Sequence, residues 1–150
     1  FVMNDKCAGG TGRFMEIVAE ALQVPLAEIG PLSLQSTKVL AFSSTCAAFV
    51  RGAAVTMRKE GERKEDILAG LHESIATRVM ALVRKVGIAD KFVISGGIGR
   101  NVALVKLIEG KLDGLKVNLP QEPMIVGAVG AAMFALDRAR KATQADAAAA

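Results

Sequence analysis

The chain has no tryptophan or tyrosine, and only one histidine, two cysteines and four prolines among its 150 residues. The formal net charge is +4, but the basic residues are scattered among acidic ones and no aromatic platform is present on which bases could stack. Two cysteines are too few for a disulfide-dense secreted scaffold. The longest uncharged apolar run, Met124 to Leu136, is too short to cross a bilayer, and no secretory signal opens the chain. We therefore expect a cytoplasmic protein that binds neither nucleic acid nor membranes.

What the sequence does contain is enough apolar side chain, 51% of residues, for one ordinary folded domain. The hydrophobic pattern predicts strands at 1–4, 39–43, 92–95 and 115–119. It predicts helices over 14–22, 46–59, 65–86, 102–111 and 125–141, and a short helical turn at 25–29 that Gly30 and Pro31 stop. Alternating strands and helices indicate an α/β fold. Because the sheet is thin and Phe1 opens directly into a strand pattern, we expect a fragment of a longer chain, with a partial domain over 1–142 and a frayed tail over 143–150.

The two cysteines occupy similar local settings, each after a strand candidate and close to the start of a helix. Unpaired backbone N–H groups and the helix dipole favour a thiolate at such a place. Two thiolates per chain are half the ligand set of an iron–sulfur cluster, and a symmetric dimer would supply four. From the residues alone two other interpretations stay open for Cys7 and Cys46. They are either two unrelated buried core residues or a disulfide pair.

Two glycine-rich loops are candidates for nucleotide contact. The first, Cys7-Ala8-Gly9-Gly10-Thr11-Gly12, precedes a helix that Thr11 could cap, and the second, Ser95 to Asn101, links a strand to a helix. Glycines let backbone amides approach a phosphate at the start of a helix. A plain strand-to-helix turn explains the first loop equally well, and close packing explains the second.

Two smaller features have structural interpretations. His72 flanks the apolar stripe of the long helix predicted over 65–86, where a histidine is typically a boundary residue with a satisfied side chain rather than a catalyst. Gly127, Gly130 and Ala131 form a small-residue face on the last helix, which favours close packing of that helix on a sheet. No catalytic triad, histidine-rich metal spacing or pair of catalytic carboxylates is present, so we assign no catalytic residue.

Several stretches together resemble one known family. They are Met3–Phe14 with the first cysteine motif, Ser43–Cys46 with the second, Ile67–Val86, Ser95–Asn101 and Gly127–Ala132. In this order they resemble the ATPase family that contains the activators of 2-hydroxyacyl-CoA dehydratases and the ATP-hydrolysing subunits of benzoyl-CoA reductase. The resemblance covers about residues 1–140, and the two cysteine motifs make it specific.

The resemblance implies an actin/Hsp70/sugar-kinase fold with ATP and Mg²⁺ between two lobes, of which this chain is the C-terminal part. It implies one [4Fe–4S] cluster shared by two identical or related subunits, each giving two cysteines, here Cys7 and Cys46. ATP hydrolysis would drive low-potential electrons from ferredoxin to an acyl-CoA reductase or dehydratase in an oxygen-sensitive, anaerobic system. The nucleotide would contact residues of both glycine loops, namely Gly9, Gly10, Thr11, Gly12, Gly96, Gly97, Arg100 and Asn101. The family's phosphate loops precede this stretch, so the chain alone should not hydrolyse ATP.

The sequence departs from the family pattern at a few positions. Gly9 stands where the first cysteine motif usually has alanine, and Arg51 and Ala53 stand where many relatives carry glutamates. The latter change points to one of two unlike subunits, so we expect an electron-activating ATPase subunit of benzoyl-CoA reductase that serves aromatic degradation. The alternatives are a homodimeric activator of a 2-hydroxyacyl-CoA dehydratase and a redox-silent, kinase-like nucleotide-binding protein.

Overall fold

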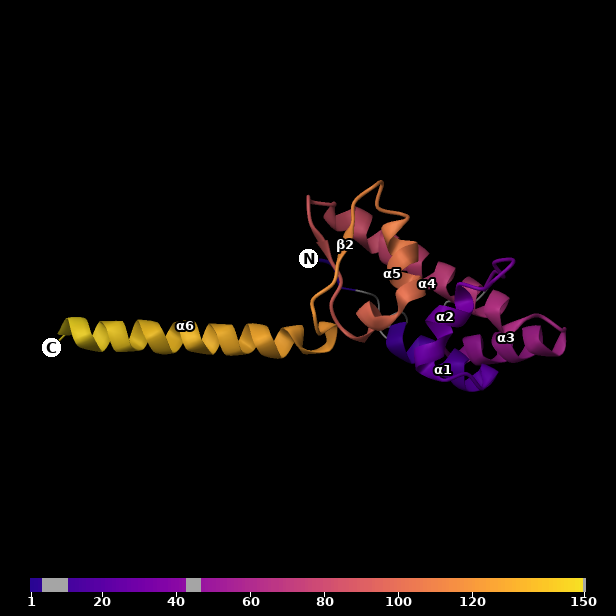
Figure 1. The fold of residues 1–150 in the computed structure, drawn as a ribbon, viewed down its shortest axis with the longest axis horizontal. Coiled ribbons are helices and arrows are strands. Elements are labelled where there is room, and N and C mark those ends of the chain that lie inside the picture. Colours follow the sequence, from indigo (N-terminus) through magenta and orange to yellow (C-terminus); the bar gives the residue numbers. More distant parts are fainter. Residues whose placement is uncertain (4–10, 43–46, 150) are drawn as a thin grey trace.

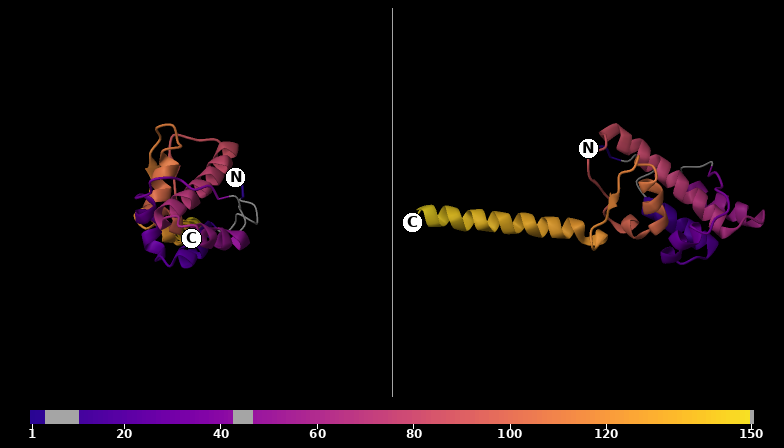
Figure 2. Two further views of the ribbon diagram at one scale, coloured as in Figure 1. Left: turned by 90° about the vertical axis from the view of Figure 1, so that its right-hand side faces the viewer. Right: turned by 45° about the horizontal axis from the view of Figure 1, so that its top comes forward.

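The computed structural model describes residues 1–3, 11–42 and 47–149. Helices dominate, with three short 3₁₀ turns (η) and two short strands between them. In chain order the elements are α1 (Thr11–Leu22), η1 (Leu26–Glu28), α2 (Ile29–Ser33), α3 (Ala47–Lys59), α4 (Lys64–Val86), β1 (Phe92–Val93), η2 (Gly97–Arg100), α5 (Val102–Glu109), β2 (Val117–Asn118), η3 (Pro123–Ile125) and α6 (Val126–Ala149). Helices α1 to α5 pack into one body, and α6 projects away from it (Figures 1 and 2).

Helix α4 is the centre of the body, as its long apolar stripe predicts. It contacts α1, α2, α3 and α5, and seven consecutive residues, Asp66 to His72, are buried. Acidic residues occupy its first turn and Arg84 and Lys85 its last turn, which suits the helix dipole. Gly87 ends it in the left-handed region, with φ of 91°. The core around α4 includes Val18, Leu22, Ile29, Val50, Ile67, Leu68, Leu71, Ile75, Leu104, Ile108 and Leu112.

The sheet is smaller than the sequence predicts. Strands β1 and β2 pair in parallel, with Phe92 opposite Val117, and η2 and α5 form the crossover between them. This strand–helix–strand unit confirms the α/β alternation. The strands predicted at 1–4 and 39–43 are wrong as far as the structure describes them, because Phe1–Met3 and Val39–Phe42 pair with no other strand. A strand needs a hydrogen-bonded neighbour, and an extended apolar segment alone does not supply one.

Two helix ends also differ from the prediction. Gly30 and Pro31 do not stop the helical turn, because α2 continues through them to Ser33. Pro31 lies in the first turn of α2, where a backbone N–H has no intrahelical acceptor, so its missing donor is harmless. The last helix continues past Lys141 to Ala149, because its end is rich in alanine, the strongest helix former.

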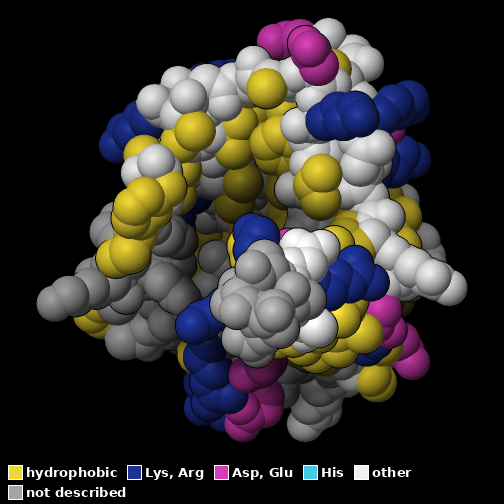
Figure 3. Space-filling model, turned by 90° about the vertical axis from the view of Figure 1, so that its left-hand side faces the viewer, with side chains coloured by type: hydrophobic (Ala, Val, Ile, Leu, Met, Phe, Trp, Pro, Cys, Tyr) yellow, Lys and Arg dark blue, Asp and Glu magenta, His cyan; other side chains and the backbone are white. Residues whose placement is uncertain are grey.

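Helix α6 does not pack on a sheet, contrary to the prediction from its small residues. Among the described elements its main contact is with η3, and an added Cβ at Gly127 or Gly130 would meet no atom within 4 Å. Met133 and Phe134 on α6 are exposed. Figure 3 shows hydrophobic side chains lying open on the body beside this helix. In the part of the chain that the structure describes, no helix is both long and apolar enough to cross a membrane.

The segment 37–40 packs against the first half of α4. A buried carboxylate on α4 accepts hydrogen bonds from its backbone, and a glycine on α4 lets the two backbones come close together. Oδ1 of Asp66 accepts hydrogen bonds from the backbone N–H of Thr37 at 2.8 Å and of Lys38 at 3.1 Å. Burial raises the pKa of Asp66, but these hydrogen bonds and nearby Arg63 outweigh burial, so its pKa lies below the usual value. Beside it, a Cβ on Gly70 would lie only 1.8 Å from the carbonyl oxygen of Leu40.

We predict that Gly70→Ala destabilises the full-length protein by about 3 kcal/mol or more, because backbone atoms must move to admit the methyl group. The matched control is Gly52→Ala on α3, where an added Cβ meets nothing within 4 Å. That change should stabilise the protein by up to about 1 kcal/mol through helix propensity. Urea unfolding of both variants measures the difference, and equal midpoints would contradict the close approach of Leu40 to α4.

Candidate functional site

The second glycine loop connects β1 to α5, and its glycines have different tasks. Gly96 has a φ of +86°, and its N–H donates to the carbonyl oxygen of Pro123 at 2.7 Å. Gly99 is buried against Pro123, where a Cβ would come within 3.0 Å of the proline ring. Gly97 is exposed, and an added Cβ there would meet no protein atom within 4 Å. Close packing therefore explains Gly99, whereas Gly97 leaves an open approach to the backbone.

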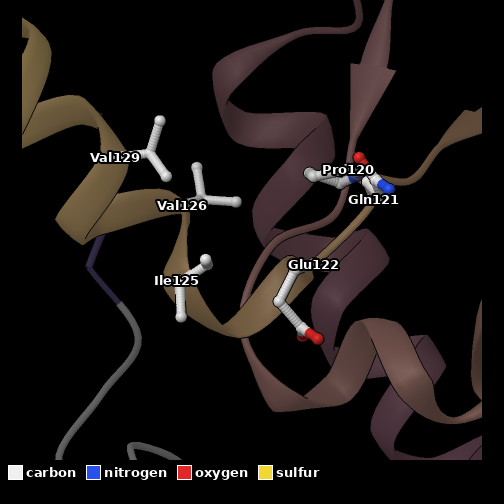
Figure 4. Close-up of a pocket in the computed structure, with 6 residues that line it drawn as sticks. All are labelled: Pro120, Gln121, Glu122, Ile125, Val126 and Val129. Carbon is white, nitrogen blue, oxygen red and sulfur yellow. The ribbon is translucent and has the colours of Figure 1, made fainter.

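Arg100 ties this loop to the segment before α6. Its Nη2 donates to both carboxylate oxygens of Glu122, each at 2.8 Å. Glu122 also lines an open cavity of about 570 Å³ between that segment and the first turns of α6. Pro120 and Gln121 form one side, and Ile125, Val126 and Val129 form the other (Figure 4). An apolar hollow beside an open glycine loop can accept a flat ring next to a phosphate chain.

The structure turns the side chain of Asn101 inward instead of toward this hollow. Its Oδ1 accepts from the backbone N–H of Leu104 at 3.0 Å and so caps α5. Its Nδ2 lies 2.8 Å from Nε2 of His72 on α4 and 3.5 Å from the sulfur of Met15 on α1. The sequence predicts Asn101 as a nucleotide contact, but these partners occupy both ends of its amide. Its backbone N–H donates to the carbonyl oxygen of Ile98, and its own carbonyl oxygen accepts from Val105.

His72 is buried rather than at the boundary, with 1% of its surface exposed. Burial lowers the pKa of His72 to about 4, while the Leu68 carbonyl one turn earlier acts in the opposite direction. The ring is therefore neutral at pH 7, and its Nε2 accepts from Asn101. Nδ1 makes no hydrogen bond of ordinary geometry. The spacing of Leu68, His72 and Ile75 along one helix face is the signal from which this burial could have been predicted.

The first glycine loop lies largely outside the described residues, and so do both cysteines. Cys7, Gly9, Gly10 and Cys46 belong to the stretches that the structure does not describe. Thr11 begins α1, and Gly12 follows it in an exposed position. Within the described residues no group of three or more metal-ligating side chains comes together.

The helices that follow the two cysteine motifs pack against each other. Helix α1 begins at Thr11 and α3 begins at Ala47, and the two are in contact. Figure 1 shows both running from the middle of the body toward the end that carries the turn between α3 and α4. Neither helix has an acidic residue in its first turn as the structure describes it, and the positive end of a helix dipole favours negative charge. The start of each helix therefore suits an anionic group.

Comparison with known proteins decides the family. The model of the BadF/BadG/BcrA/BcrD ATPase family matches residues 1–135. The chain belongs to this family. The chain is also 40% identical over 143 residues to an (R)-2-hydroxyglutaryl-CoA dehydratase activating ATPase from Acidaminococcus fermentans, a match that covers 94% of this chain and 54% of the relative.

A solved structure confirms the fold class. It is the activator of the 2-hydroxyisocaproyl-CoA dehydratase from Clostridium difficile with bound ADPNP, at 37% identity and a TM-score of 0.88. The match covers 96% of this chain and 53% of that one, so the chain corresponds to part of an actin-like ATPase. One of the benzoyl-CoA reductase subunits from Thauera aromatica is 33% identical over 147 residues, with 94% of this chain and 52% of the relative covered. The chain thus spans about half the length of these relatives.

We predict that the full-length protein loses stability as the pH falls from 6.5 to 4, because the unfolded histidine binds a proton that the buried ring of His72 does not accept. The contribution of His72 to the free energy of unfolding should be about 2 kcal/mol smaller at pH 5 than at pH 7.5. His72→Gln keeps an acceptor for Asn101 but does not titrate, so the stability of this variant should depend less on pH between 6.5 and 4. Urea midpoints at the two pH values test this, and the same slope in both proteins would contradict it.

Proposed function

We propose that this chain is part of an ATP-dependent activator of a 2-hydroxyacyl-CoA dehydratase. The observation that carries the proposal is the likeness to a dehydratase activator with bound ADPNP, at 37% identity and a TM-score of 0.88 over nearly the whole chain. The sequence favoured a benzoyl-CoA reductase subunit first, on the strength of Arg51 and Ala53. The relatives named as dehydratase activators support the alternative better, at 38% and 40% identity against 33% for the reductase subunit.

The nucleotide would bind at the open face of the second glycine loop. Gly97 leaves the backbone of η2 accessible, and Gly96 turns the chain there in a conformation that favours glycine. The neighbouring hollow, lined on one side by Ile125 and Val126, would receive the base. Thr11 and Gly12 at the start of α1 are proposed on the phosphate side together with Gly9 and Gly10. In this arrangement Arg100 would contact the nucleotide while it stays paired with Glu122. Asn101 would hold the loop through its hydrogen bonds inside the protein rather than touch the nucleotide with its side chain.

Cys7 and Cys46 would hold half of a [4Fe–4S] cluster, and a second subunit would supply the other two thiolates. The described residues fit such a group, because α1 and α3 pack together, start just after the two cysteine motifs and carry no carboxylate in their first turns. When bound, the cluster supplies one-electron transfer at low potential. The chain's own contribution is to fix the two thiolates at helix starts, where the positive dipole ends favour their ionised form.

The whole-protein activity gives the direct test. With ATP and a strong one-electron donor under anaerobic conditions, the full-length protein should activate a purified 2-hydroxyacyl-CoA dehydratase, and it should carry about two irons per chain. Cys7→Ser and Cys46→Ser should each lose the iron and the activation while retaining ATP affinity. Activation of benzoyl-CoA reductase instead would select the second candidate. Iron-free protein, or full activity in both serine variants, would point to a redox-silent nucleotide-binding protein.

We predict that Gly97→Val lowers the affinity for ATP about tenfold or more, because the new side chain would stand where the ligand approaches the backbone. The protein itself leaves room for this side chain, so folding should be little affected. Gly52→Val on the exposed face of α3 is the matched control and should leave ATP affinity unchanged. Calorimetry measures both, and equal affinities in the two variants would remove Gly97 from the nucleotide site.

A further inference from the structure

Asn101 is the last residue of the second glycine loop, and its side chain joins that loop to three helices. Leu104 of α5 donates its backbone N–H to one end of the amide, and that end must therefore be the oxygen, since a backbone N–H can only donate. The two N–H groups of the amide then face Nε2 of His72 on α4 and the sulfur of Met15 on α1. Both ends of one side chain are thus paired, and each partner lies on a different helix.

The surroundings hold this half-buried side chain from two sides. His72 is buried and neutral, so its Nε2 remains an acceptor throughout the physiological pH range. On the opposite side α2 packs closely against Asn101. A Cβ added to Gly30 of α2 would lie 2.9 Å from Oδ1 of Asn101 and 3.4 Å from the side chain of Val102. Because the amide is paired at both ends, a change of rotamer would break these hydrogen bonds, so the side chain resists a shift of its backbone.

The contacts of Asn101 link two regions that the proposed function uses. The loop is open at Gly97, where the nucleotide is proposed to bind, and Asn101 follows η2 directly. Met15 lies near the start of α1, the helix that follows the Cys7 motif. A shift of the loop at one end would therefore reach α1 through Asn101 and Met15.

We propose that Asn101 is a positioning residue that couples nucleotide binding at Gly96 and Gly97 to the placement of α1. The proposal rests on the nucleotide part of the proposed function and deepens it, but it does not depend on the cluster. Asn101 acts through His72 and Met15 and donates no side-chain hydrogen bond to the nucleotide. The second glycine loop and α1 are thereby mechanically joined, although more than eighty residues separate Met15 from Asn101 in the sequence.

The experiment measures amide hydrogen exchange of the peptide that spans α1, in the full-length protein with no nucleotide, with ADP and with the non-hydrolysable analogue ADPNP. In the wild-type protein we expect ADPNP to change the exchange rate in α1 about fivefold or more, the low end of ordinary coupling between sites. Asn101→Ser still caps α5 through its hydroxyl but is too short to reach His72 and Met15. This variant should bind ADPNP within about threefold of wild type while the response of α1 falls below about twofold.

Asn118→Ser is the matched control. Its amide donates to the backbone carbonyl of Phe92 at 3.2 Å, on the exposed side of the strand pair and away from α1. It should keep the full response. His72→Leu removes the acceptor from the α4 side while leaving Asn101 in place, so it should weaken the response as Asn101→Ser does, and it carries the test if the serine variant does not fold.

Three outcomes overturn the proposal. One is an unchanged response of α1 in Asn101→Ser or His72→Leu, and another is a wild-type protein that binds ADPNP without any response in α1. The third is a loss of ADPNP affinity of about tenfold or more in Asn101→Ser, which would make Asn101 a direct nucleotide ligand. A wild-type protein that binds neither ADP nor ADPNP fails the proposed function itself, and the coupling fails with it.

Discussion

The rest of the body depends on the burial of the first half of α4. Seven consecutive residues, Asp66 to His72, are buried, so this part of the helix has neighbours all round and not on one face alone. Helices α2 and α5 and the segment 37–40 are arranged by that constraint, since each covers one side of it. Gly70 is required where the covering segment comes closest, because no side chain fits between α4 and the carbonyl of Leu40.

Burial all round also forces two polar side chains of α4 to find partners inside the protein. Asp66 is satisfied by backbone N–H groups of the covering segment, and Nε2 of His72 by the amide of Asn101. An unpaired polar group in such a place would destabilise the fold by about 1–3 kcal/mol. The two pairs therefore fix where the chain must pass. Asp66 holds the segment that leads toward Cys46, and His72 holds the end of the glycine loop that carries Gly97.

The proposed activity places two demands on this architecture, a backbone open to a nucleotide and two thiolates at helix starts. The structure meets the first with an exposed Gly97 beside an apolar hollow, and it packs together the two helices that follow the cysteine motifs. Asn101 lies between these regions and contacts the helix that follows the first motif. The coupling that an ATP-driven activator needs would thus be carried by a short chain of contacts inside a close-packed core.

The sequence by itself determined the helices, the glycine loops, the cysteine motifs and the family, because helical periodicity and motif residues are local properties that need no partner. Only the tertiary structure decided which extended segments pair as strands, since pairing needs a neighbouring strand. Val39–Phe42 has none among the described residues, and its Leu40 lies against α4 instead. It also decided what each site residue does. Asn101 stands in a loop typical of nucleotide contact, yet His72, Met15 and Leu104 occupy its amide. The ion pair between Arg100 and Glu122 gave no signal in the sequence, because a turn of the tertiary fold brings the two side chains together.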